Sequence, residues 1–199
     1  MPSFLHEKFI VQIVGELQCQ LKSIEGASAE FAKEIISSAS ASIKFADQEY
    51  SKHDPDVQFT HSKARYPGVV IEVSYSQKGK DLGRLSNDYI PGSDSEIRVV
   101  VGLDIEYKMT KKATLSVWQP SIVTNEAGEK ELVTQQIVAN QVFRDSNEHI
   151  LHRRPTVTSA RLHHNSLGQA RRKALRFNCY LCENPMLVSS ARRRSSVHC

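Results

Sequence analysis

The sequence predicts a single α/β domain in which helices flank a mixed central sheet. One reason is the order of patterns along the chain: a helical segment, three strand-like runs, a second helical segment and two more strand-like runs. Another is the run 69–75, which is apolar on both faces, as is typical of a strand in the middle of a sheet. With 199 residues, 40% hydrophobic and 24% charged, the chain is long enough for one domain with a substantial core.

The first half of the chain predicts a long helix followed by strands. Ser3 can cap a helix whose apolar residues recur at near-helical spacing, and Gly26 ends it. The segment 27–38 suits a second, short helix, although it is rich in small residues. Runs of strand-forming residues, separated by polar segments and the turn Pro67-Gly68, predict strands over 41–46, 57–60 and 69–75.

The second half predicts one more helix and at least two more strands. Asp81 is a good N-cap, and the apolar residues of the following helix fall on one stripe, formed by Leu82, Leu85 and Tyr89. Pro91-Gly92 ends that helix. Strands are then expected over 97–105 and over 113–118, the latter ended by Pro120, whereas 132–142 fits neither a helical nor a strand period cleanly.

Positive charge is concentrated in the last quarter of the chain. Residues 1–143 contain 15 Lys/Arg and 19 Asp/Glu, a net charge of −4, whereas residues 144–199 contain 11 and 3, a net charge of +8. The periodic pattern also decays after about residue 143. We therefore expect a core domain over 1–143 and a basic C-terminal extension over 144–199, loosely packed or partly helical, that can bind a polyanion.

Several classes of protein are disfavoured by the composition. No apolar run approaches the roughly 18 residues of a membrane span, so we expect no membrane partner. The four cysteines form no disulfide framework, which favours an intracellular compartment, cytoplasmic or nuclear. Cys179 and Cys182 resemble half of a zinc site, but no second pair follows at ligand spacing.

A carboxylate interrupts the most apolar strand. Glu72 lies within the run 69–73, and burying its charge costs several kcal/mol unless the side chain is paired or binds a cation. Asp56 stands sixteen residues earlier, at the start of the preceding strand. Two carboxylates on adjacent strands could hold Mg²⁺ or Mn²⁺, and such a cation activates water and neutralises a phosphodiester. A structural interpretation also stays open, in which Glu72 pairs with Lys78, Lys80 or Arg84.

These residues resemble a known superfamily. Pro55-Asp56 followed by Glu72-Val73-Ser74 resembles the PD-(D/E)XK nucleases, and the chain over roughly 5–120 is similar to the Uma-type putative endonucleases. The residues that carry the second similarity are 70–76, Asp81, Tyr89 and 99–104. The resemblance implies a restriction-endonuclease-like fold with Asp56 and Glu72 as ligands of Mg²⁺ or Mn²⁺.

The chain departs from the superfamily pattern at the lysine. Ser74 stands two residues after Glu72, where the motif has that lysine, and Lys78 and Lys80 are the candidates to replace it, with Arg84 nearby. Two functions therefore remain open. One is a metal-dependent nuclease, with DNA as the expected substrate. The other is a catalytically inactive module that kept the fold and binds nucleic acid or protein. A homodimer is compatible with both.

Overall fold

The computed structural model describes residues 4–47, 50, 52–74, 81–106, 110 and 112–147. Six strands in this part of the chain form one mixed sheet, in the order β1-β2-β3-β4-β5-β6. Only β3 and β4 run parallel, and every other neighbouring pair is antiparallel. The strands are β1 Ile35–Ser37, β2 Val57–His61, β3 Val69–Ser74, β4 Val99–Ile105, β5 Ala113–Thr124 and β6 Lys130–Arg144.

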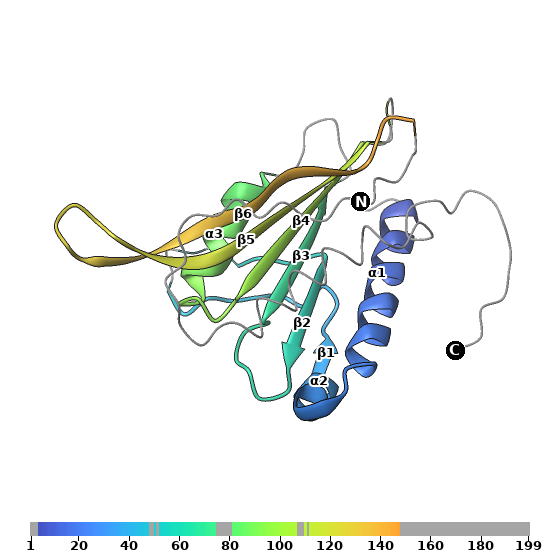
Figure 1. Ribbon diagram of the computed structural model, residues 1–199, viewed down its shortest axis with the longest axis horizontal. Helices are drawn as coiled ribbons and strands as arrows, with labels where there is room; N and C mark the ends of the chain where they lie inside the picture. The colour runs from blue at the N-terminus through green and yellow to red at the C-terminus, as the bar shows by residue number, and fades with distance from the viewer. Residues whose placement is uncertain are drawn as a thin grey trace, which may run out of the picture.

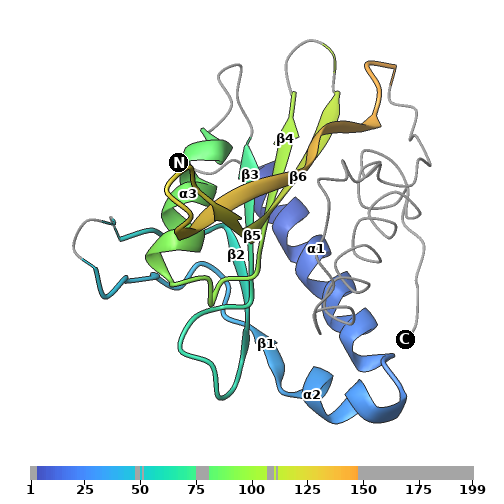
Figure 2. The same cartoon turned by 60° about the vertical axis from the view of Figure 1, so that its left-hand side comes forward.

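Helices lie on both faces of this sheet. The long helix α1 (Phe4–Lys22) packs on one face and α3 (Leu82–Gly92) on the other, as Figure 2 shows with the sheet between them. A 3-10 turn, η1 (Gly26–Ser28), and a short helix, α2 (Ala29–Lys33), connect α1 to β1. The chain passes through α3 between β3 and β4, and a crossover of this kind allows two strands to run parallel. The predicted α/β class with a mixed, helix-flanked sheet is confirmed.

Two apolar cores form, one on each face of the sheet. Phe9, Ile13 and Leu17 of α1 pack against alternate strand residues that include Ile71 and Val73. On the opposite face, α3 packs against the other set of alternate residues, and this second core contains Ile43, Tyr66, Val70, Tyr89, Ile90, Ile97, Val100 and Trp118. Strand β3 contributes to both cores and has a hydrogen-bonded neighbour on each side, so the prediction that it is central is confirmed.

The hairpin formed by β5 and β6 extends beyond the rest of the sheet as an arm, which we define as residues 119–135 (Figure 1). Strand β4 pairs with β5 only as far as Trp118, whereas β6 follows it to Thr124. The expectation that Pro120 ends the strand is wrong, because Pro120 pairs with Thr134 within β5. A proline is tolerated there since, among the described strands, β5 has a partner on one side only at this point. The ambiguous segment 132–142 lies within β6.

One prediction near the N-terminus is wrong, and another is right only in part. The segment 41–46 forms no strand, and its only ladder contact is an isolated bridge between Ile43 and His53. Ile43 is instead ordered by its side chain, which is buried in the core beneath α3. The segment expected to be helical over 27–38 contains the short helix α2, but its last residues form β1, the first strand of the sheet. Of the extension predicted over 144–199, residues 148–199 lie outside the described part of the chain.

Candidate functional site

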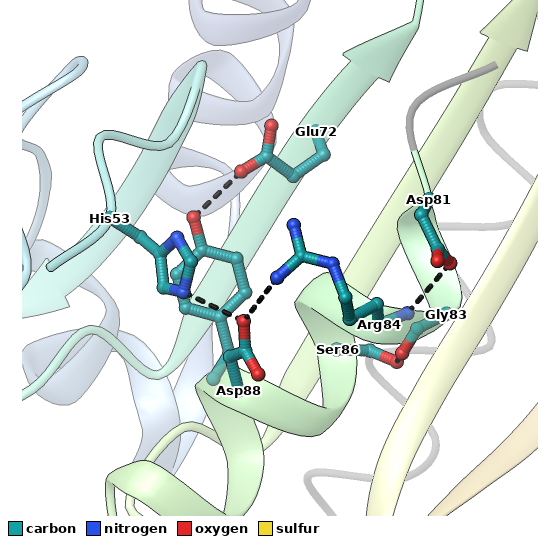
Figure 3. A network of polar contacts seen from close by, with 8 residues as sticks. His53, Glu72, Asp81, Gly83, Arg84, Ser86 and Asp88 are labelled. Atoms are coloured by element: carbon teal, nitrogen blue, oxygen red, sulfur yellow. Dashed lines mark hydrogen bonds and ion pairs between the residues drawn. The ribbon is translucent and has the colours of Figure 1, made fainter. Parts of the chain in front are cut away.

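The carboxylate of Glu72 is buried on the face of the sheet that α3 covers. The side chain of Tyr89, also buried, donates a hydrogen bond from its hydroxyl to Glu72 Oε1 at 2.7 Å (Figure 3). Burial, and then the nearby charge of Glu72, raise the pKa of Tyr89 far above its ordinary value. The phenol therefore stays protonated and remains a donor. This charge-assisted hydrogen bond offsets part of the cost of burying a carboxylate in the central strand.

Asp56 lies at the same end of the sheet, one residue before β2 begins. Its Oδ2 atom accepts a hydrogen bond from the backbone N–H of Val73 at 2.7 Å, where a longer β2 would have supplied a backbone acceptor. Its Oδ1 atom lies 3.4 Å from His6 Nε2 of α1. The charge of Asp56 also contributes to raising the pKa of Tyr89. The structure therefore places Asp56 near the pair formed by Glu72 and Tyr89, although its carboxylate is shared with α1.

A pocket of about 390 Å³ opens beside Glu72. Its walls come from α3, from β3 and from the segment that precedes β2. Three carboxylates and one guanidinium line it, a net charge of −2 when the histidine is neutral. The lining residues are His53, Asp54, Glu72, Asp81, Arg84, Leu85 and Tyr89. A negative pocket of this kind favours a cation and repels an unneutralised phosphate.

The first turns of α3 place a basic side chain at this pocket. Asp81 caps the helix, because its Oδ1 accepts a hydrogen bond from Arg84 N at 3.0 Å. The Arg84 guanidinium donates to Asp88 Oδ2 at 3.1 Å, and His53 Nε2 lies 2.9 Å from the same oxygen (Figure 3). Asp88 therefore ties the segment before β2 to α3. The expectation that Arg84 is a candidate partner of Glu72 differs from the structure, which pairs Arg84 with Asp88.

Ser74, which stands in the place of the motif lysine, is buried at the end of β3. It pairs in the parallel ladder with Asp104 of β4, and its hydroxyl hydrogen-bonds the Asp104 carboxylate. Burial raises the pKa of Asp104, and its Oδ1 atom is buried without a hydrogen-bond partner in the part of the chain that the structure describes. Ser74 therefore pairs with one oxygen of a partly buried carboxyl group and supplies no cation.

The structure brings together only part of the predicted site. Glu72 and Asp56 lie at the same end of the sheet, whereas Lys78 and Lys80 fall outside the described residues. The sequence analysis assigns no role to His53 or Asp88, because their contact joins residues 35 positions apart and no local pattern contains it. Asp104 belongs to the similarity over 99–104, but not as the partner of Ser74. Residue Tyr89 was recognised as part of the similarity, but not as the partner of Glu72.

The donor atoms fit a hard divalent cation in part. Glu72 of β3 and Asp56, one residue before β2, offer two carboxylates, which Mg²⁺ accepts when water completes the set, although Asp56 does not line the pocket that Glu72 lines. Among the described residues, however, no group of three or more His, Cys, Asp or Glu side chains is placed to hold a metal ion. The described helices include none with the length and apolar character needed to span a membrane.

Comparisons of the chain with protein-family models, with curated proteins and with solved structures found no match.

Proposed function

We propose that this protein is a metal-dependent nuclease with a restriction-endonuclease-like fold, which hydrolyses phosphodiester bonds, with DNA as its substrate. The observation that carries the proposal is the buried carboxylate of Glu72, which lines an open pocket beside the central strand. Asp56 does not line this pocket, but its carboxylate accepts a hydrogen bond from the N–H of Val73, the residue next to Glu72. Burying a carboxylate beside a pocket destabilises the fold unless a bound ligand stabilises the charge. Groups in such unfavourable environments are concentrated at functional sites.

The chain's own residues fit the electrostatics of this reaction. Asp56 and Glu72 would hold Mg²⁺ or Mn²⁺, and a divalent cation would offset the negative charge that lines the pocket. When bound, the cation would polarise a phosphoryl oxygen and lower the pKa of a coordinated water. The side chain of Arg84 is 62% exposed, so it can contact a phosphate group while it stays paired with Asp88.

Nucleic acid is the polyanion that the charge distribution favours. The extension 144–199 carries a net charge of +8, and contacts to phosphate need only Lys and Arg. Binding through such contacts should weaken steeply as the salt concentration rises, because counterions are released from DNA.

The test is metal-linked stabilisation, measured by thermal unfolding with and without Mg²⁺ or Mn²⁺. A cation that binds only the folded state stabilises it by about 2.7 kcal/mol at 100 times the dissociation constant. We expect this shift for the wild type and for Glu34→Gln, a carboxylate outside the pocket, and we expect Glu72→Gln to lose it. The same proteins are then assayed for cleavage of a supercoiled plasmid. Equal metal shifts in all three proteins, or equal cleavage by Glu72→Gln, would reject the proposal.

A catalytically inactive module that binds nucleic acid or protein is the second candidate. The buried hydrogen bond from Ser74 to Asp104 favours it, because the motif position that normally carries a lysine has a structural role here. This candidate predicts salt-dependent DNA binding without cleavage in either metal. It also predicts that Lys78→Ala and Lys80→Ala leave that binding close to the wild-type value, apart from the loss of one phosphate contact each.

A further inference from the structure

His53 is held rigidly at the wall of the pocket. Its backbone forms an antiparallel bridge with Ile43, with hydrogen bonds of 2.8 and 3.1 Å. Its ring lies 5.2 Å from the Tyr89 ring and 6.1 Å from the Phe45 ring, measured between centroids. The side chain is 12% exposed and lines the pocket that Glu72 also lines. The imidazole is therefore oriented before any ligand arrives.

The contact with Asp88 fixes which nitrogen of His53 carries the proton. A carboxylate can only accept, so in the neutral ring the nitrogen that lies 2.9 Å from Asp88 Oδ2 is the N–H donor, and this is Nε2. Arg84 donates to the same oxygen from one turn earlier in α3 and holds the carboxylate in place (Figure 3). The lone pair is thus on Nδ1, which has no hydrogen-bond partner within the described residues.

We propose that His53 is the general base of this pocket, oriented by Asp88. The inference deepens the proposed nuclease function and depends on it. His53 Nδ1 takes a proton from a water molecule whose oxygen forms a bond to phosphorus. The bond from phosphorus to the leaving oxygen breaks, and that oxygen takes a proton from solvent. Asp88 stabilises the imidazolium that results, which later returns its proton to water.

This assignment explains how a site with Ser74 in place of the motif lysine can activate water. Positioned histidines are the commonest general bases, and such a base contributes about 10²–10⁴-fold in rate. A histidine that only joins the segment before β2 to α3 would affect folding but not proton transfer. The experiment must therefore separate a missing base from a weakened fold.

The experiment measures plasmid cleavage in Mg²⁺ by wild type, His53→Ala and His53→Gln, with and without added imidazole. The amide of His53→Gln can still donate to Asp88, so this variant keeps the structural contact and removes the base. The matched control is His61→Ala, because His61 also lies beside a carboxylate, 3.6 Å from Glu34, and does not line the pocket.

We expect both His53 variants to cleave about 100-fold more slowly or worse, and imidazole to restore part of the rate of His53→Ala, whose side-chain space it can occupy. His61→Ala should cleave at the wild-type rate. The metal-linked thermal shift should persist in both His53 variants, because Asp56 and Glu72 are intact. Asp88→Asn should also slow cleavage, since an amide can hold the ring in the wrong tautomer.

Three outcomes overturn the inference. If His53→Gln cleaves at the wild-type rate, His53 is not the general base. The nuclease function would still stand in that case, provided that metal stabilises the wild type and not Glu72→Gln. The inference is also rejected if His53→Ala cleaves slowly, unfolds at the normal temperature and is not accelerated by imidazole. If the wild type neither cleaves DNA nor is stabilised by metal in a Glu72-dependent way, the nuclease function fails, and the base fails with it.

Discussion

The hydrogen bond between Tyr89 and Glu72 gives the sharpest test of how the site is stabilised. Tyr89→Phe removes only the hydroxyl, whose oxygen lies 2.7 Å from Glu72 Oε1. Both residues are almost fully buried, at 0% and 2% exposure, and both line the pocket, so only a water molecule that enters from the pocket could replace the lost donor. A hydrogen bond to a charged group contributes about 1.5–3 kcal/mol, and we expect the free energy of unfolding at pH 7 to fall by that amount.

A double-mutant cycle separates this interaction from other effects of the substitution. Urea unfolding is measured for wild type, Tyr89→Phe, Glu72→Met and the double variant, because methionine keeps most of the volume of glutamate without its charge. In the Glu72→Met background the hydroxyl has lost its acceptor, so Tyr89→Phe should cost little there. The coupling energy should therefore equal most of the 1.5–3 kcal/mol. In thermal unfolding, each kcal/mol of it should correspond to a shift of about 2–4 °C in the melting temperature.

The reasoning is refuted if Tyr89→Phe costs the same in both backgrounds. That result would mean that the hydroxyl and the carboxylate do not interact in solution. Burial and the charges of Asp56 and Asp54 would then be the remaining causes of the raised pKa of Tyr89.

Three further predictions concern the same part of the sheet. Asp56→Ala should cost about 1–3 kcal/mol in urea unfolding even without metal, because it leaves the N–H of Val73 without its acceptor, whereas Asp56→Asn should cost less. Gly102→Ala should cost about 1–3 kcal/mol by overpacking and alter the fluorescence of Trp118, whose ring would lie 2.9 Å from the new methyl group. The free energy of unfolding should fall as the pH rises above about 10, because Tyr89 stays protonated in the folded protein, where its pKa is raised, but ionises in the unfolded chain. Tyr89→Phe should show a smaller fall, because this variant lacks the ionising hydroxyl.

The buried strands were predictable because their side chains decide their structure. The runs 57–60, 69–75 and 97–105 are apolar and bounded by turn residues, and each coincides with a strand to within two residues. Segments whose structure depends on a distant partner were not predictable. Ile43 lies in a strand-like run that has no neighbouring strand to pair with beyond one isolated bridge. Pro120 lies in β5, which continues past it because β6 pairs with this part of β5.

The candidate site divides in the same way. Glu72 could be singled out because a carboxylate in an apolar run is anomalous wherever the chain folds. Its partner Tyr89 could not be singled out, because in the sequence it is only one member of an apolar helical stripe. Its hydroxyl reaches the carboxylate because of the way in which α3 crosses β3. The contact between His53 and Asp88 joins residues 35 positions apart in sequence, so no local pattern contains it.

The arm formed by residues 119–135 gives the molecule two levels of local stability. Within the described part of the chain its strands pair only with each other, and two of its apolar side chains, Ile122 and Val123, are 70% and 40% exposed. Backbone amides there can open and exchange with deuterium by local fraying, whereas those of β3 and β4, buried beneath helices on both faces, need a much larger unfolding event. The arm can therefore lengthen, shorten or change sequence while the strand that carries Glu72 keeps its structure.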